Sequence, residues 1–366
     1  MKIIDKYLHK YIFYTMLMVT VVTAFILLCN QLLRYLDYVA TGKFPLNILF
    51  RLVLLELPIL FALLLPLGLF IGILLSYGKL YTNSEMTVLF SCGFSKKQLI
   101  TSTLKFTTLI LIIVSVLGLW LNPKLNQYRD KMLAIASSTS VLQSITAGKF
   151  QIAKDSNKVY YVEKTSDDNK KLQNFFVAQS SNTTTDNSPK NWTVMSAESG
   201  SFKTNKKNHQ QFLVAENGYR YSGIAGQLNY QIAKFATNSF RITPVAIDEN
   251  SNNINALNTS YLIKNIDANL GYMAELQWRL SLPIMTIILA LFAIPLSQTQ
   301  PRQGRFIKFL PAILLYILYA NMIFISRDWL SNAVIPAYIG VWWVHAVALI
   351  SALMLLGKAN YSHRKK

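Results

Sequence analysis

The stretch GKLYTNSEMTVLFSCGFSKK (Gly78–Lys97) lies between two long apolar runs. LPILFALLLPLGLFIGILLS (Leu57–Ser76) precedes it and LITSTLKFTTLILIIVSVLGLWL (Leu99–Leu121) follows it. Runs of about 20 apolar residues are long enough to cross the ~30 Å hydrocarbon core of a bilayer. The stretch between them is too short and too polar to cross. The sequence therefore predicts two membrane spans joined by a loop that carries a short helix.

The composition of the whole chain agrees with a membrane protein. Of its 366 residues 52% are hydrophobic and only 14% are charged, and its mean hydropathy is +0.31, which is too apolar for an ordinary soluble domain. Hydropathy predicts six spans, at about 11–34, 52–77, 99–121, 276–297, 306–326 and 334–357. The basic N-terminus could open a signal peptide, but no small-residue cleavage pattern follows the long first run, so an uncleaved first span is expected.

Basic residues predict the orientation. Short loops rich in Lys and Arg stay in the cytoplasm, and the basic residues of this chain gather on one side of a six-span arrangement: Lys2, Lys6, Lys10, Lys79, Lys96, Lys97, Arg302, Arg305, Lys308, Lys358, Arg364, Lys365 and Lys366. Both termini are therefore expected in the cytoplasm. This pattern accounts for much of the net charge of +19, so the charge does not point to nucleic acid.

A block of different character separates the third span from the fourth. It opens with a helical-looking stalk, KLNQYRDKMLAIASSTSVL (Lys124–Leu142). Short stretches rich in β-branched and aromatic residues then alternate with polar turn clusters, which predicts an all-β domain, a sandwich or a jelly roll. The expected domains are residues 1–122 with the first three spans, 123–270 with the extracytoplasmic β domain, and 271–366 with the last three spans.

The loop helix is predicted at about 83–93. Thr82 and Glu85 fit a capping box, and Gly93 supplies a stop. Three apolar residues at helical spacing, Met86, Leu89 and Phe90, form a stripe behind the acid. Such a helix could pack into a groove on a cytoplasmic partner, or it could be a connector in the headgroup layer. The residues alone leave both alternatives open.

No catalytic constellation appears in the sequence. The four histidines are scattered without metal-ligand spacing, and neither a G-x-S-x-G motif nor a G-x-x-x-x-G-K-[ST] phosphate loop is present. We expect a non-catalytic chain with no metal and no cofactor, so any energy from ATP must come from another subunit. Cys29 and Cys92 fall on opposite sides of the membrane, which excludes a disulfide between them.

Charged side chains near the spans are costly and are candidate sites. Arg34 and Arg327 lie near the outer ends of the first and fifth spans, where they could bind an anionic ligand or simply extend to the interface. Arg327 also has Asp328 beside it as a possible partner. Three other features have local interpretations: a helix pair of Glu275 with Arg279, an interfacial Lys105, and a close-packing face at Gly68, Gly72 and Ser76. Glu56 and Arg51 are left without an assigned partner.

Three segments resemble one known family. They are LPLGLFIGILLSYGKLYTNSEMTVLFSCGFSK, ELQWRLSLP and IPLSQTQPRQGRFIKFLPAILLY, and the order of spans and β domain also agrees. The chain resembles the YjgP/YjgQ-type permeases of the lipopolysaccharide-export (Lpt) ABC transporter, and within them the F type. The resemblance implies an inner-membrane permease that takes lipopolysaccharide from the outer leaflet and passes it to a periplasmic bridge.

The resemblance also implies partners and site residues. It implies a G-type permease, two copies of a cytoplasmic ATPase, and periplasmic Lpt bridge proteins whose jelly-roll domains stack edge to edge with this one. Glu85 would pair with an ATPase arginine while Met86, Leu89 and Phe90 fill the docking groove. Arg34 and Arg327 match basic positions of the F type and become candidate contacts for lipid phosphates. Gln31 departs from the family pattern, which often has a basic residue there.

Two other functions are compatible with parts of the sequence. A mechanotransmitting ABC permease moves no lipid, but such proteins usually have four spans rather than six. A membrane-anchored envelope assembly factor would explain the β domain. It would not need an acid-tipped amphipathic helix between two spans.

Overall fold

The computed structural model describes residues 3–40, 46–143, 147–148, 150–153, 158–166, 171–180, 191–204, 211–224, 227–242, 253–298 and 309–361. The chain divides into two compact units. We call the first the helical unit; it comprises Met1–Leu32, Arg51–Asp130 and Asn253–Lys366. The second, the sheet unit, comprises Leu33–Phe50 and Lys131–Asn252. The orientation signals at Lys2, Arg302, Arg305, Lys308, Arg364, Lys365 and Lys366 lie outside the described residues.

Long apolar helices make up most of the helical unit. Within the described residues, five helical stretches are long and apolar enough to cross a membrane: Ile3–Ala40, Ile48–Thr82, Lys96–Leu133, Leu270–Leu296 and Phe309–Ser331. They correspond to α1 (Ile3–Ala40), α2 (Leu46–Thr82), α4 (Lys96–Val116) with its continuation, α7 (Leu270–Leu296) and α8 (Phe309–Ser331). The sixth predicted span corresponds to α9 (Trp342–Tyr361), whose apolar part, Trp342–Lys358, is shorter.

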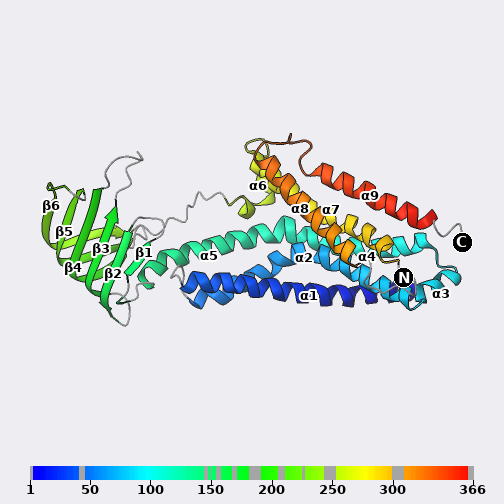
Figure 1. The fold of residues 1–366 in the computed structure, drawn as a ribbon, viewed down its shortest axis with the longest axis horizontal. Coiled ribbons are helices and arrows are strands. Elements are labelled where there is room, and N and C mark those ends of the chain that lie inside the picture. Colours follow the sequence, from blue (N-terminus) through cyan, green and yellow to red (C-terminus); the bar gives the residue numbers. More distant parts are fainter. Residues whose placement is uncertain are drawn as a thin grey trace. The chain divides into compact units, whose positions relative to one another are not determined.

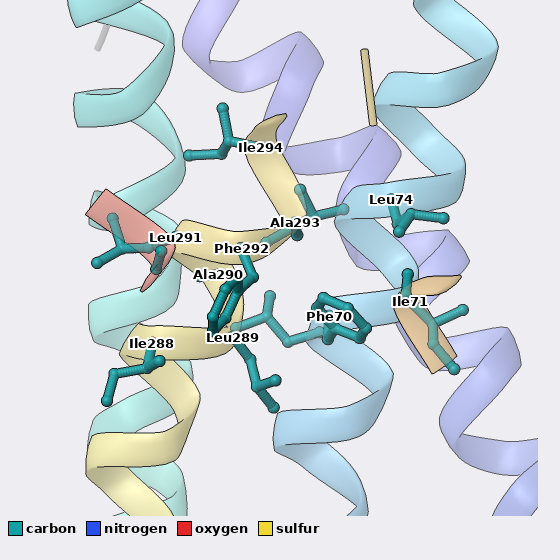
Figure 2. Close-up of a cluster of buried hydrophobic side chains, with 14 of the residues drawn as sticks. Phe70, Ile71, Leu74, Ile288, Leu289, Ala290, Leu291, Phe292, Ala293 and Ile294 are labelled. Atoms are coloured by element: carbon teal, nitrogen blue, oxygen red, sulfur yellow. The ribbon is translucent and has the colours of Figure 1, made fainter. Parts of the chain in front are cut away.

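The helices pack around α7. This helix is apolar on nearly all sides, as expected of a helix that other helices surround, and its residues from Ile288 to Ile294 are almost completely buried. Figure 2 shows Phe70 of α2 close to Leu289 and Phe292 of α7 in this core. Large parts of α1 and α8 have no cover within the described chain.

The small-residue face of α2 packs against α1, as predicted. A Cβ atom at Gly68 would collide with the Thr20 hydroxyl, and one at Gly72 would lie 3.0 Å from the backbone nitrogen of Met16. Ser76 donates a hydrogen bond to the Tyr11 carbonyl at 3.2 Å. The GxxxG pattern therefore serves close packing inside this chain.

The loop helix, α3, runs from Glu85 to Ser91. Figure 1 shows it at the same end of the helical unit as the N-terminus, with α6 (Thr259–Lys264) at the opposite end. Gly93 ends the turn with φ +87°, so the predicted stop is confirmed. The predicted capping box at Thr82 is wrong, because α2 continues to Thr82, whose hydroxyl donates to the Gly78 carbonyl instead. The capping box that forms is at the start of α4.

The predicted stalk is helical. After α4 the chain passes through a π-helical turn, η1 (Leu117–Leu121), into α5 (Asn122–Gln143). A π turn leaves a carbonyl without its usual helical donor, and here the hydroxyl of Thr259 donates to the Leu119 carbonyl. A short 3₁₀ turn, η2 (Ile254–Ala256), and then α6 lead from the end of the β block into α7.

The sheet unit contains a six-stranded antiparallel sheet. Its strands, which lie side by side in Figure 1, are β1 (Phe150–Ala153), β2 (Lys158–Thr165), β3 (Lys171–Ser180), β4 (Asn191–Thr204), β5 (Gln211–Ile224) and β6 (Gln231–Ile242). Each strand pairs with its sequence neighbours, so the described strands form one meander rather than the two sheets of a sandwich. Apolar residues from β2 to β5 form its own small core: Val162, Leu172, Phe175, Met195, Ala197, Leu213 and Ala215.

Candidate functional site

Glu85 is the first residue of α3 and is half-buried. The Tyr7 hydroxyl donates to its Oε2 atom at 2.8 Å, and the Asn83 amide donates to Oε1 at 3.2 Å. Within the described part of the chain, no Lys or Arg forms an ion pair with this carboxylate. Neutral donors thus hold Glu85 in place, and no cation of the described residues compensates its negative charge.

The apolar stripe of α3 packs into the helical unit itself. Met86 is fully buried in the core, and Leu89 and Phe90 pack against that core from partly buried positions. This corrects the expectation that Met86 fills a partner's groove, because its side chain has no surface to offer. The exposed apolar residue of α3 is Val88, three positions after Glu85 and therefore on the same side of the helix. The stripe of Met86, Leu89 and Phe90 therefore anchors α3 to its own bundle. The exposure of Val88 was not predicted from the sequence.

A buried carboxylate joins two arginines at the other end of the helical unit. Glu275 on α7 is only 4% exposed. Its Oε1 atom accepts from Nε of Arg279 at 2.8 Å, and its Oε2 atom accepts from Nη2 of Arg327 at 2.6 Å. The predicted helix pair of Glu275 and Arg279 is confirmed, whereas Arg327 pairs with Glu275 and not with Asp328. We call these three residues the arginine cluster.

The two arginines of the cluster differ in how many of their N–H donors are already bonded. Arg279 is buried, and its remaining bonds go to the Thr259 hydroxyl at 2.9 Å and to the carbonyls of Ile254 and Asn255. Arg279 therefore fastens the segment that enters α6 and α7. This contact could not be predicted from spacing, because the segment follows the long β block.

Arg327 retains donors that could reach a ligand. Its Nη2 atom is bonded to Glu275 and to the Asn255 side chain at 2.9 Å, and its guanidinium lies 5.3 Å from the centre of the Trp278 ring. Its side chain is 28% exposed, and no partner of its Nε and Nη1 atoms occurs in the described ranges. Of the donor atoms of Arg327, Nη2 is thus the one that the described chain holds.

Glu56 on α2 has the partner that the sequence did not reveal. It is buried and accepts from Nη1 of Arg129 on α5 at 3.4 Å and from the Gln31 amide at 3.2 Å. Gln31 stands where the family often has a basic residue. Here its side-chain amide donates to the Glu56 carboxylate. Arg51 is exposed.

Two further predicted positions are also placed by the structure. Arg34 is exposed on the part of α1 that belongs to the sheet unit, whereas Arg327 belongs to the helical unit. Lys105 is largely exposed, and its ammonium group lies 3.8 Å from the Asp5 carboxylate; its interfacial position stays a prediction.

Comparison with known proteins shows to which family this chain belongs. The family described as lipopolysaccharide export system permease LptF/LptG matches residues 6–358, which include Glu85 and the whole arginine cluster. The chain belongs to the LptF/LptG family. It is 30% identical to the lipopolysaccharide export system permease protein LptF of Escherichia coli (strain K12) over 358 residues, 96% of this chain and 94% of that protein.

Similarity to LptG proteins is weaker and covers less of the chain. The LptG of Escherichia coli (strain K12) is 26% identical over 170 residues, which is 45% of this chain and 46% of that protein. The LptG of Haemophilus influenzae is 28% identical over 105 residues, 29% of each chain. This LptF/LptG permease is thus similar to an LptF along almost its entire length.

Proposed function

We propose that this chain is the F-type permease subunit of a lipopolysaccharide exporter. The observation that carries the proposal is the family match over residues 6–358, together with the full-length similarity to an LptF. The subunit extracts lipopolysaccharide from the outer leaflet of the inner membrane and passes it to a periplasmic bridge. A separate ATPase subunit hydrolyses ATP, and a G-type permease completes the membrane part.

The proposed topology has six spans, with α9 as the sixth. The end of the helical unit near α3 faces the cytoplasm, and the sheet unit lies in the periplasm. Basic residues of the described chain at the start of α1, the end of α2 and the start of α4 support this orientation: Lys6, Lys10, Lys79, Lys96 and Lys97. Both termini are then cytoplasmic.

Glu85 is proposed as the contact to the ATPase. Its carboxylate has two neutral donors and no cation from the described chain, and a cation from a partner would compensate the charge. An arginine suits this position, because its planar guanidinium can bind a carboxylate through two parallel hydrogen bonds. Exposed Val88 and the uncovered parts of Leu89 and Phe90 supply apolar contact beside it, while Met86 keeps α3 attached to its own bundle.

Arg327 and Arg34 are proposed as contacts for the phosphates of the lipid. Arg327 has two donor atoms, Nε and Nη1, without a partner in the described segments, and its partly exposed side chain lies at the end of the unit that we place at the outer leaflet. Trp278 and Glu275 fix the guanidinium plane. Nε and Nη1 point to different sides of the group, so each would donate to a phosphate oxygen singly. Arg34 is exposed near the end of α1.

The sheet unit is proposed to stack with equivalent domains of its partners as part of a jelly-roll-like trough. Its two edge strands are β1 and β6. An edge strand has backbone donors and acceptors available for another strand.

Reconstitution tests this function. The permease is placed in liposomes with its G-type partner and ATPase, and lipopolysaccharide that becomes bound to a soluble bridge domain is measured over time. The proposal predicts release that requires ATP and this subunit. Complexes that hydrolyse ATP but release no lipid would instead favour a mechanotransmitting permease.

A further inference from the structure

The bond between Tyr7 and Glu85 joins two elements that are far apart in the sequence. The residues are 78 positions apart, and the Tyr7 hydroxyl on α1 lies 2.8 Å from the carboxylate that begins α3. The other donor to this carboxylate, Asn83, belongs to the same loop. In the described chain, Tyr7 is thus the residue that ties the Glu85 carboxylate to another helix. A hydrogen bond to an ionised carboxylate is stronger than one between neutral groups.

The beginning of α1 is itself firmly held by its neighbours. Tyr11, one turn after Tyr7, has its ring 6.1 Å from that of Tyr7, and the ammonium group of Lys79 on α2 lies 5.4 Å from its centre. Ser76 of α2 donates to the Tyr11 carbonyl, and Asp5 pairs with Lys105 of α4. Because Tyr7 is bonded to Glu85, a displacement of Glu85 would pull on this packed first part of α1.

A glutamate side chain with free torsions loses rotamer freedom when a partner fixes it. The Tyr7 hydroxyl fixes the carboxylate in advance and leaves one lone pair of Oε2 and the whole of its charge for a cation. The ring of Tyr7 is partly exposed at the surface beside α3, so the hydroxyl stays next to the proposed docking site and is not covered by the core.

We propose that Tyr7 is a positioning residue for Glu85. Its hydroxyl holds the carboxylate in the orientation that receives the cation of the ATPase, and after docking it transmits the movement of α3 directly to α1. This inference rests on the proposed docking role of Glu85 and goes beyond it, because it adds a path from α3 to the first span that bypasses the loop connection through α2.

The variant Tyr7→Phe tests the inference, since it removes the hydroxyl and keeps the ring. Tyr14→Phe is the matched control, because Tyr14 is exposed on the same helix and its hydroxyl has no hydrogen-bond partner among the described residues. The complete complex is reconstituted, and two quantities are measured: the affinity for the ATPase and the lipid released per ATP hydrolysed. We expect Tyr7→Phe to weaken ATPase binding about fivefold, as for the loss of one hydrogen bond, and to lower the lipid released per ATP. Tyr14→Phe should change neither quantity, and wild-type values for both in Tyr7→Phe would overturn the inference.

A double-mutant cycle with Glu85→Ala separates this inference from the proposed function. If Glu85→Ala itself leaves ATPase binding unchanged, the docking role of Glu85 fails, and the role of Tyr7 fails with it. If Glu85→Ala weakens binding and Tyr7→Phe does not, only the role of Tyr7 fails. The inference predicts that Tyr7→Phe has no further effect on ATPase binding once Glu85 is alanine. An equal further loss would show that Tyr7 acts independently of Glu85, and would overturn it.

Discussion

At the scale of single residues, the arginine cluster has one carboxylate for two guanidinium groups. Glu275 is buried with Arg279, while Arg327 reaches it from a partly exposed position. Removing one partner of a buried ion pair costs more than the pair contributes, because a charge stays buried without compensation. Substitution of Glu275, the residue that both arginines share, should therefore destabilise the cluster most.

The variant Glu275→Gln tests this sensitivity, since it keeps the shape and removes the charge. We expect a loss of about 3 kcal/mol in the free energy of unfolding, because Arg279 remains buried without its counter-ion. Thermal unfolding of the purified permease in one detergent measures the change as a lower melting temperature. Asp267→Asn is the control, because Asp267 is exposed and forms no ion pair in the described structure. Equal melting temperatures for Glu275→Gln and the wild type would contradict this account of the cluster.

The charge of Arg34 should matter for lipid capture. Arg34→Glu reverses the charge that a phosphate would meet, whereas Arg34→Lys keeps it, so we expect about tenfold less lipopolysaccharide to remain bound to Arg34→Glu than to Arg34→Lys. Lipid that copurifies with each variant is quantified by mass spectrometry. Arg51→Glu, an exposed change outside the predicted contacts, should retain lipid like the wild type. Equal retention by both Arg34 variants would reduce Arg34 to an interfacial side chain.

What the sequence could predict at this scale follows from distance along the chain. Glu275 and Arg279 are four residues apart, and helical spacing alone pairs them. Arg327 is 52 residues from Glu275, and Tyr7 is 78 residues from Glu85. Such pairs depend on how helices pack, which local patterns do not contain. Asp328 was the wrong partner for Arg327 because the expectation used the nearest acid in the sequence.

At the scale of elements, the contact between α1 and α2 depends on glycine. At Gly72 an added Cβ would lie 3.0 Å from three atoms of Met16, including the backbone nitrogen. Backbone atoms cannot rotate away as a side-chain end can. The helices would have to separate, which loses the dispersion contacts that hold membrane helices together.

The same substitution at two helical glycines tests this packing. Gly72→Ala should lower the stability of the permease by about 1–2 kcal/mol, because crowding in a packed core outweighs the better helix propensity of alanine. Gly357→Ala in α9 meets no atom within 4 Å, so it should be neutral or stabilising by up to about 1 kcal/mol. Melting temperatures in the same detergent compare the two variants. A Gly72→Ala protein as stable as Gly357→Ala would mean that α1 and α2 tolerate separation.

Helix boundaries show where sequence reasoning ended. The sequence contains two capping-box patterns near the loop, Thr82 with Glu85 and Ser95 with Gln98, and only the second is used. The choice depends on where α2 ends, and α2 extends one turn past its apolar run. The loop helix itself and its stop at Gly93 were predictable, because they follow from local spacing and from one glycine. The inward direction of Met86 was not, because an amphipathic pattern does not say which neighbour covers its apolar side.

At the scale of the whole molecule, composition and hydropathy predicted apolar helices on both sides of an inserted β block, and the structure has both. The single meander sheet could not be distinguished from a sandwich, because alternation within strands says nothing about which strands pair. The partners of the permease follow from the assembled transporter and not from the fold of one chain. The large uncovered parts of α1 and α8 are where we expect lipid or the second permease to lie.

One measurement tests the central claim most directly: purification of the tagged permease from its native membrane in a mild detergent, followed by mass spectrometry of the proteins and lipids that accompany it. The wild type should bring an ATPase, a second permease of the same family and lipopolysaccharide. Glu85→Lys, which places a cation opposite the proposed ATPase cation, should lose the ATPase and keep the second permease and the lipid. A wild-type permease recovered intact without any ATPase, or a Glu85→Lys variant that retains as much ATPase as the wild type, would contradict the account.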